Sequence, residues 1–349
     1  MKVAIASVQV PFIRGGAERL AERLRRELLL RGHQAEIVTF PFKWSPASAL
    51  LDSMERGRKL DLTEVNGEPI DRVIALKFPA YYLSHPAKTI WLLHQHRQAY
   101  DLWGTPYGDL QNLPGGRKIR RLIRKADNRA FESAGGLYSI SRCTARRLER
   151  HNGLRAEVLY PPPDGDGSLH CEGYGDFIFY PSRFEPMKRQ SLLIEAARHL
   201  HSSVRIVLAG GGSKAETLRL QELAARHRVE DRVTLLGYIS EEEKIRHYAN
   251  CLAVYFGAYD EDYGYITLEA FLSVKTVLAH DDAGGPLEFI ENGTSGHVMP
   301  PDPAALASCI DHLAFHPQRA REMGEAGRRR LSRMEMGWDG VIGKLMDHS

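Results

Sequence analysis

The chain has 349 residues, of which 43% are hydrophobic, 26% charged and 9% aromatic. This length exceeds the usual size of one core and fits two domains, and the composition excludes a disordered or fibrous protein. No apolar run reaches the roughly 18–20 residues that span a bilayer. The opening MKVAIASVQVPF lacks a small-residue cleavage site, so it predicts a first strand and not a signal peptide.

The net charge is +3, but the two halves of the chain differ. Residues 1–165 carry 27 Lys and Arg against 17 Asp and Glu, a net of +10, and the remainder has a net of −7. This asymmetry predicts either an anionic partner for the first half, such as a membrane surface or a phosphorylated acceptor, or charge complementarity between two domains. The four cysteines have no metal-binding spacing, which is typical of reduced thiols in a cytoplasmic protein.

Short β-branched runs alternate with amphipathic helices from the start of the chain. KVAIASVQV leads to a loop at 11–16 and then to a helix that ends at Arg31 and Gly32. Further strands are expected at 35–40, 71–78, 88–95 and 136–141. This alternation is typical of a parallel sheet with helices on both faces.

The alternation breaks at Tyr160–Gly175, where Pro, Gly and Asp are frequent, and this segment predicts an interdomain linker. It then resumes, with five strands expected at 176–184, 204–212, 232–239, 251–259 and 275–281. We therefore expect an α/β protein of two doubly wound, Rossmann-like domains that face each other across a cleft. Ligands of such sheets lie at the carboxyl ends of the strands.

The segment EDYGYITLE, from Glu261 to Glu269, follows an apolar strand and opens a helix. A helix N-terminus offers backbone N–H groups and a partial positive charge to a phosphate. Glu269, one turn further in, is suited to accept hydrogen bonds from sugar hydroxyls. The alternative is an ordinary helix-start carboxylate together with a solvated loop acid.

A second loop, directly after the apolar run DFIFYPS at 176–182, carries Arg183 and Lys188. Two cations on one loop can neutralise a diphosphate leaving group without a metal, although the alternative is two solvated side chains. Three glycine turns, at 15–16, 210–212 and 284–285, also follow strands. None of them fits the GxGxxG pattern, which argues against a nicotinamide enzyme.

Taken together, these motifs resemble the family 4 retaining glycosyltransferases of GT-B fold, also called glycosyltransferase group 1. The resemblance covers most of the chain. It is carried by Gly15–His33, Val158–Asp164, the Arg183-x4-Lys188 pair, the Glu261-x7-Glu269 motif and Asp282–Ala307. It implies an acceptor-side domain at 1–165, a nucleotide-sugar domain at 166–332, and a C-terminal helix at 333–349 that packs back on the first domain.

The resemblance also implies roles for single residues. Arg183 and Lys188 would hold the diphosphate and stabilise it as it leaves, Glu269 would bind the ribose, and Glu261 would bind the transferred sugar. His94 would point at the sugar from the first domain. The other donor-binding residues would be Gly15, Gly16, Gly237, Tyr238, Ile239, Tyr263, Gly264, Tyr265, Ile266 and Thr267. No cofactor and no metal are expected beyond the nucleotide-diphosphate sugar.

Two points stay open beside this resemblance. Arg189 stands where the family usually has Gly, and it either fills solvent space or adds a third cation to the phosphate site. His96 lies two residues after His94, and for both the alternative is a buried histidine without a site role; this alternative is favoured for His96. No other histidine shows a metal-ligand spacing.

A basic segment at 116–129 bears on the acceptor. Its seven cations, from Arg117 to Arg129, accompany apolar residues at helical spacing. This pattern predicts either peripheral contact with an anionic membrane or an apolar face packed on the sheet with a solvated basic face. Nucleic-acid binding is disfavoured because aromatic residues do not interleave with the basic ones.

The resemblance thus implies a retaining, metal-independent hexosyltransferase that uses a UDP- or GDP-sugar and a hydroxyl acceptor on a glycan, glycolipid or small molecule. The alternatives are a nucleotide-sugar epimerase of the same fold and a catalytically silent partner subunit. The expected location is cytoplasmic, at the inner face of the membrane where the basic segment binds lipid.

Overall fold

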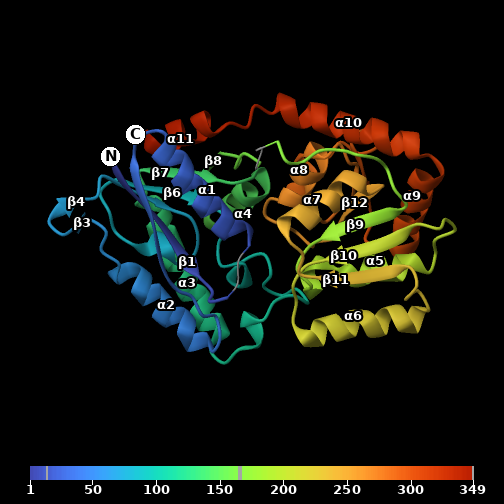
Figure 1. The fold of residues 1–349 in the computed structure, drawn as a ribbon. Helices are drawn as coiled ribbons and strands as arrows, with labels where there is room; N and C mark the ends of the chain where they lie inside the picture. The colour runs from blue at the N-terminus through green and yellow to red at the C-terminus, as the bar shows by residue number, and fades with distance from the viewer. Residues whose placement is uncertain (13–14, 164–166, 348–349) are drawn as a thin grey trace. The chain divides into compact units, whose positions relative to one another are not determined.

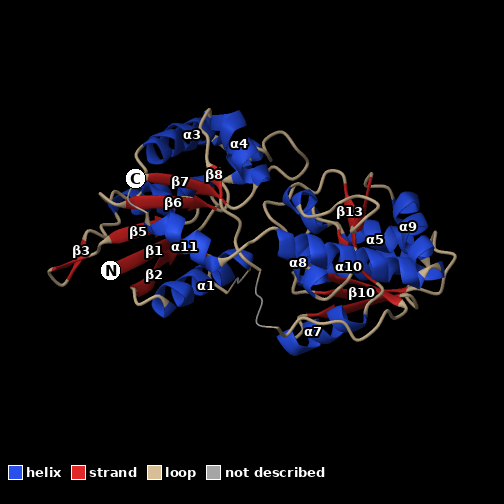
Figure 2. Cartoon of the chain, turned by 90° about the horizontal axis from the view of Figure 1, so that it is seen from above, coloured by secondary structure: helices blue, strands red, loops and turns tan. Residues whose placement is uncertain are grey.

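The computed structural model describes residues 1–12, 15–163 and 167–347. It divides into two units, Met1–Pro161 with Met336–Ser349, and Pro162–Glu335. These divisions lie within a few residues of the boundaries expected at 165/166 and 332/333, and the first expected boundary itself lies outside the described residues. Each unit contains one six-stranded parallel sheet with helices around it (Figure 2).

Unit 1 has the strand order β2-β1-β5-β6-β7-β8, and every pair is parallel. Its strands are β1 (Lys2–Gln9), β2 (Gln34–Pro41), β5 (Arg72–Ala75), β6 (Lys88–Leu92), β7 (Gly136–Ser139) and β8 (Glu157–Val158). Its helices are α1 (Gly16–Leu30), α2 (Ala47–Lys59), α3 (Gly116–Glu132), α4 (Arg142–Asn152) and α11 (Trp338–Met346). A small hairpin is formed by β3 (Glu64–Val65) and β4 (Glu68–Pro69).

Unit 2 has the order β11-β10-β9-β12-β13-β14, again all parallel. Its strands are β9 (Phe177–Pro181), β10 (Arg205–Ala209), β11 (Val233–Gly237), β12 (Ala253–Phe256), β13 (Val277–His280) and β14 (Gly296–Met299). Its helices are α5 (Gln190–Ala197), α6 (Lys214–His227), α7 (Glu241–Asn250), α8 (Tyr265–Leu272), α9 (Pro303–Phe315) and α10 (Pro317–Arg333). The sequence predicted five of these six strands and missed β14, a four-residue strand at the sheet edge.

The C-terminal helix α11 packs within unit 1, beside α1 (Figure 1). The Arg31 guanidinium donates to Asp339, and the Arg72 guanidinium donates to the Leu345 carbonyl at 3.3 Å. The Trp338 ring lies edge-on to the buried Trp91 ring, with centroids 6.2 Å apart. The end of the chain therefore completes the first unit, because it covers strand residues that would otherwise be exposed.

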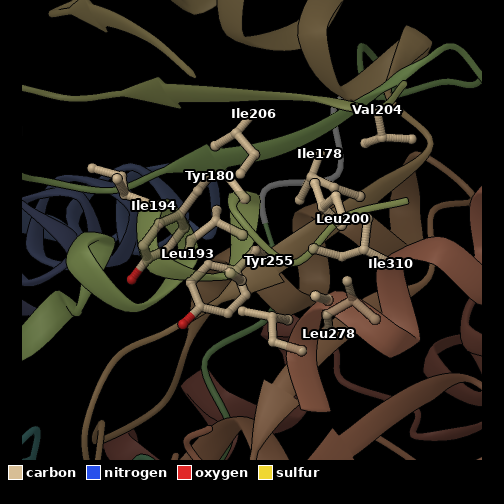
Figure 3. Close-up of a cluster of buried hydrophobic side chains, with 14 of the residues drawn as sticks. Ile178, Tyr180, Leu193, Ile194, Leu200, Val204, Ile206, Tyr255, Leu278 and Ile310 are labelled. Carbon is tan, nitrogen blue, oxygen red and sulfur yellow. The ribbon is translucent and has the colours of Figure 1, made fainter. Parts of the chain in front are cut away.

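The core of unit 2 is a continuous cluster of aliphatic side chains with two tyrosines at its margin. Figure 3 shows the rings of Tyr180 on β9 and Tyr255 on β12 side by side, with both hydroxyl oxygens pointing away from the aliphatic residues. The Tyr180 hydroxyl donates to the Lys188 carbonyl at 2.8 Å, and the Tyr255 hydroxyl is 2.8 Å from Nε2 of His280. The core thus ends in polar contacts directly beneath the loop that carries Lys188.

Helix α3 combines an exposed basic face with a buried acid. Its apolar residues, such as Ile119 and Ile123, face the core, so packing on the unit occupies the apolar face. Asp127 on the same face is fully buried and accepts hydrogen bonds from the hydroxyls of Tyr81, Tyr82 and Tyr100 at 3.0, 2.6 and 2.6 Å. Burial raises the pKa of Asp127 to about 7, and the three donors oppose the rise.

The raised pKa of Asp127 makes the stability of unit 1 depend on pH. Because the pKa is about 7 in the folded chain against 3.8 as the ordinary value, the folded state holds the proton more tightly. The contribution of Asp127 to stability is therefore fully present below about pH 4 and is lost as the pH rises to about 7, by on the order of a few kcal/mol at about 1.4 kcal/mol per pKa unit. We expect Asp127→Asn to flatten this fall.

The measurement is chemical unfolding at several pH values, followed by tryptophan fluorescence. All four tryptophans lie in unit 1, so the signal reports this unit alone. Asp109→Asn is the matched control, since Asp109 is exposed. A pH profile that is equally steep in the Asp127→Asn protein would rule out this origin of the pH dependence.

Candidate active site

The candidate residues of unit 2 lie where parallel strands end. The loop after β9 carries Arg183 and Lys188, the loop after β12 carries Glu261, and the loop after β13 carries Asp282. Because β9, β12 and β13 are neighbours in one parallel sheet, their carboxyl ends share one edge. This is the edge at which open α/β sheets bind ligands.

Lys188 and Glu261 form an ion pair across this edge. Lys188 is the last residue of the short 3-10 helix η4 (Pro186–Lys188). Its side chain is 17% exposed, and that of Glu261 is 26% exposed. A cation and a carboxylate at these exposures are both within reach of a ligand. The structure therefore brings together two of the predicted residues, 73 positions apart in sequence.

Arg183 does not join this pair. Its guanidinium binds Glu185 at 2.9 Å, and its side chain is 47% exposed. The contact is local to one loop and open to solvent, so it holds the guanidinium weakly. A ligand phosphate can compete with Glu185 for Arg183.

Glycines allow the loops after β12 and β13 to touch. The Glu261 N–H donates to the Ala283 carbonyl at 2.8 Å, and the Gly285 N–H donates to the Glu261 carbonyl at 2.8 Å. A Cβ at Gly284, which has a φ of +79°, would lie 2.6 Å from the Glu261 carbonyl oxygen. The position of Glu261 thus depends on the absence of a side chain at 284.

Helix α8 begins beside this contact. Its N-cap is Gly264, with a φ of +90°, and a Cβ there would lie 2.4 Å from Pro286. Tyr263 and Thr267 are buried, and the Tyr263 ring packs edge-on against Tyr265 and Phe289. These side chains hold the start of the helix in place, and Tyr265 and Ile266 are partly exposed.

Glu269 is held by two residues of α7 that the sequence analysis missed. Its carboxylate accepts from the Lys244 ammonium at 3.0 Å and from the Tyr248 hydroxyl at 2.7 Å. Burial and the nearby Glu269 charge raise the pKa of Tyr248, so this hydroxyl remains a donor. Lys244 also pairs with Glu241 at 2.6 Å. The spacing of Lys244 and Tyr248, one helical turn apart, is the only sequence signal for them.

The end of β11 supplies exposed backbone and one exposed ring. Gly237 has a φ of +69° with open space at its Cβ position, and its carbonyl accepts from the Gly210 N–H at 2.7 Å. The Tyr238 side chain is 87% exposed and Ile239 is partly exposed. This geometry leaves a flat turn with one free aromatic face, which suits stacking with a planar ring.

The predicted residues of unit 1 also lie at strand ends. Gly15 is the N-cap of α1, Gly16 opens the helix, and the Gly15 N–H donates to Glu18 at 2.8 Å. Glu18 pairs with Lys77 at 2.9 Å; burial opposes its ionisation, but Lys77 and the Gly15 N–H lower its pKa overall. Residues 13 and 14 of the expected glycine loop lie outside the described residues.

The two histidines after β6 differ. His94 is partly exposed, and its Nδ1 lies 2.6 Å from the Gln95 carbonyl. His96 is buried, and its ring lies tilted against Phe78 and edge-on to Phe42. Burial and the nearby His94 lower the pKa of His96 to about 3. His96 is thus a neutral core ring, in line with the alternative favoured for it, and only His94 is accessible.

Among the described residues, no three His, Cys, Asp or Glu side chains are grouped so that they could hold a metal ion. The same part of the chain contains no helix long and apolar enough to cross a membrane. All four cysteines are free thiols.

Comparison with known proteins places this site in a family. Residues 172–330 match the family model described as Glycosyl transferases group 1. This segment is therefore similar to group 1 glycosyl transferase domains. It contains every candidate residue of unit 2 named above, and the resemblance noted in the sequence is confirmed.

Curated relatives match with modest identity. The chain is 27% identical over 199 residues to human alpha-1,3/1,6-mannosyltransferase ALG2, covering 50% of this chain and 48% of that protein. It is 26% identical over 289 residues to a Mycobacterium tuberculosis GDP-mannose-dependent alpha-(1-6)-phosphatidylinositol monomannoside mannosyltransferase. This match covers 78% of this chain and 72% of that protein. The chain thus spans about half the length of the human relative.

Solved structures match over nearly the whole chain. Sucrose-phosphate synthase from Thermosynechococcus elongatus superposes with a TM-score of 0.76 at 17% identity, covering 97% of this chain and 96% of that one. WaaG, a glycosyltransferase involved in lipopolysaccharide biosynthesis, superposes with a TM-score of 0.73 at 15% identity, and the match covers 99% of this chain and 99% of that one. These likenesses confirm the expected GT-B fold.

The contact at Gly284 predicts a sharp contrast between two glycines. We expect Gly284→Ala to destabilise unit 2 strongly, because the new methyl adds a clash with the Glu261 carbonyl to the cost of a positive φ. Gly293 has a φ of +76° but open space around it, so Gly293→Ala is the matched control and costs only about 1 kcal/mol.

Thermal unfolding measured by far-UV circular dichroism tests this contrast. The control should lower the melting temperature of unit 2 by about 2–4 °C, and Gly284→Ala by at least twice that. Tryptophan fluorescence should stay unchanged in both, because the tryptophans lie in unit 1. Equal shifts for the two variants would mean that the loops do not need this close approach.

Proposed function

We propose that the chain is a retaining glycosyltransferase that moves a hexose from a nucleotide-diphosphate sugar to a hydroxyl acceptor. The observation that carries this proposal is the array at one sheet edge of a group 1 domain. It consists of the Lys188–Glu261 pair and the carboxylate of Glu269 fixed by Lys244 and Tyr248. Such an array offers a cation for a diphosphate and two carboxylates for hydroxyl groups.

Each residue has a distinct task in this proposal. Lys188 exchanges Glu261 for the donor diphosphate, and Arg183 exchanges Glu185 for it, so that both cations stabilise the charge that builds up on the leaving oxygens. Glu261, released from Lys188, accepts hydrogen bonds from hydroxyls of the transferred sugar. Glu269 accepts both ribose hydroxyls, since its two oxygens are already oriented. The start of α8 adds backbone N–H groups near the phosphates.

The remaining predicted residues act on the same donor. The turn of Gly237, Tyr238 and Ile239 meets the base, and the exposed Tyr238 ring stacks on it. His94 binds the transferred sugar, and the start of α1 at Gly15 and Gly16 contributes to donor binding. The acceptor hydroxyl attacks the anomeric carbon on the same face from which the nucleoside diphosphate departs, and the hydroxyl proton passes to the departing phosphate. This step uses no metal and no protein nucleophile.

Relatives indicate which donors to try first. One curated relative is GDP-mannose-dependent, and a structural neighbour, HepE from Anabaena, has been solved with UDP-glucose. A panel of UDP, GDP, ADP and their hexose conjugates, read by thermal shift, identifies the donor, because ligand at a hundred times its Kd adds about 2.7 kcal/mol. Turnover of a conjugate without acceptor would indicate an epimerase instead, and no shift from any nucleotide would indicate a silent partner subunit.

Glu269 gives the first test by substitution. We expect Glu269→Gln to weaken binding of the nucleoside diphosphate by roughly tenfold or more, since a carboxylate binds two ribose hydroxyls better than an amide does. The deoxyribose form of the same nucleotide should bind wild type and variant with a much smaller difference. Glu288→Gln, at a partly exposed acid in the same unit, is the control. Unchanged affinity in Glu269→Gln would refute the ribose role.

We further propose that the basic face of α3 lies on an anionic membrane surface that presents the acceptor. Five of its cations are exposed and have no carboxylate partner within the described residues: Arg117, Lys118, Arg121, Lys125 and Arg129. Four of these form a row at i, i+4 spacing, which costs helix stability through like-charge repulsion. By contrast, Arg321 on the exposed helix α10 pairs with Glu325 at 3.0 Å. An unpaired row on a helix whose apolar face is buried fits binding by charge alone.

Vesicle sedimentation tests this contact. Replacing Arg121, Lys125 and Arg129 with Gln should reduce binding to vesicles with 30% phosphatidylserine more than a hundredfold, at about 1 kcal/mol per cation. The control replaces Arg321, Arg328 and Arg329 of α10, an equal change in net charge. An equal loss of vesicle affinity in both triple variants would mean that net charge, and not the face of α3, causes the binding. Binding that survives 0.5 M salt would contradict an electrostatic contact.

A further inference from the structure

Arg189 occupies a backbone conformation that glycine prefers. It follows η4 and precedes α5, and its φ of +52° and ψ of +40° are left-handed. This explains why the related family usually has Gly at the position. An arginine adopts this backbone at a small cost, which contacts of its side chain can offset.

The Arg189 side chain makes such contacts with two neighbouring loops. Its guanidinium binds both carboxylate oxygens of Asp282, at 2.9 and 2.6 Å, and its Nε donates to the Gly257 carbonyl at 2.7 Å. It also lies over the Tyr259 ring, 5.6 Å from the centroid. The planar fork of Arg suits this two-point binding, and Lys does not reproduce it.

These contacts contradict both sequence expectations for Arg189. The side chain is only 12% exposed, so it does not fill solvent space. Its charge is engaged by Asp282, so it is no free third cation for a phosphate. It acts instead between the loops after β9, β12 and β13.

The backbone links this clamp to the candidate catalytic pair. Arg189 is bonded directly to Lys188, and the Tyr259 N–H donates to the Met187 carbonyl at 2.9 Å. On the other side, the Asp260 N–H donates to the Asp282 carbonyl at 2.8 Å, next to the bond from Glu261 to Ala283. The Arg189–Asp282 pair therefore joins the loops that carry Lys188 and Glu261, close to the ion pair between these two residues.

We propose that Arg189 is a positioning residue that fixes the separation of Lys188 and Glu261 and masks the Asp282 carboxylate at the edge where a diphosphate binds. The inference rests on the proposed function. Without the guanidinium, Asp282, which is 32% exposed, presents a free negative charge beside Lys188. The site would then bind a diphosphate less well, while the ribose site at Glu269, which is held separately by α7, would be unaffected.

Arg189→Gly is the test variant, because glycine keeps the left-handed turn and removes only the side chain. Arg228→Gly is its control: Arg228 also has a positive φ, +57°, but it is exposed at the end of α6 and has no carboxylate partner within the described residues. In the ligand-free protein, hydrogen exchange at the amides of Asp260, Glu261 and Gly285 should speed up roughly tenfold or more in Arg189→Gly and stay unchanged in Arg228→Gly.

Nucleotide binding separates positioning from general loosening. We expect Arg189→Gly to weaken UDP or GDP, whichever binds wild type, by roughly tenfold, and to leave the matching monophosphate within about twofold. Arg189→Lys should lose less diphosphate affinity than Arg189→Gly but should not reach the wild-type value. The loss in Lys188→Ala, which removes the ammonium itself, sets the upper limit for the loss in Arg189→Gly. In an Asp282→Asn background the effect of Arg189→Gly should shrink, because the masked charge is gone.

Three results would overturn the inference. The first is that Arg189→Gly binds the nucleoside diphosphate as tightly as wild type does. The second is that Arg189→Gly loses as much affinity for the monophosphate as for the diphosphate, which indicates a merely structural role. The third is unchanged exchange at the three amides. If wild type binds neither UDP nor GDP, the proposed function fails first, and the role of Arg189 toward a diphosphate fails with it.

Discussion

The contact between the loops after β12 and β13 is the constraint on which the candidate site depends. Two parallel strands deliver these loops to one edge, but only a glycine at 284 lets their backbones approach within hydrogen-bonding distance, and a second glycine, at 264, leaves room for the Pro286 ring. Glu261 lies inside this contact, and α8 starts from it. One steric requirement therefore fixes both the position of the Glu261 carboxylate and the start of α8, the helix that carries Glu269.

The electrostatics of the site follow from that geometry. Three carboxylates, Glu261, Glu269 and Asp282, gather on a few neighbouring elements, and each is paired with a cation from elsewhere: Lys188, Lys244 and Arg189. Pairing lets the acids lie close to a proposed phosphate site without repelling it. The pairs differ in the number of their contacts. Arg189 also donates to the Gly257 carbonyl, and Lys244 also pairs with Glu241, so both act as fixed supports. Lys188 has Glu261 as its carboxylate partner within the described residues, so this pair can exchange partners with a ligand.

The sequence predicts the fold and the spacing motifs well, because strand and helix periodicity and the glycine turns are local signals. It does not predict partners. Lys244 and Tyr248 lie on a helix that no motif marks, and only the packing of α7 beside α8 brings them to Glu269. Arg189 shows the same limit: its departure from glycine is visible in the sequence, but the carboxylate that binds it is 93 residues away. Asp127 was a missed signal, since it lies four residues after Ile123 and four before Phe131, on the buried face.

Helix α3 shows how a buried acid determines what a basic helix can do. An amphipathic basic helix that is free to rotate can insert its apolar face into lipid. Here three tyrosine hydroxyls hold Asp127 on the opposite side from the cation row, and Arg120 and Arg124 donate to the carbonyls of Ala99 and His151 at 2.9 and 2.7 Å. Rotation of the helix would break all of these bonds and leave a carboxyl and three hydroxyls without partners, which costs more than shallow insertion returns. The row of cations is therefore a rigid face, which suits electrostatic attraction to anionic groups better than insertion into lipid.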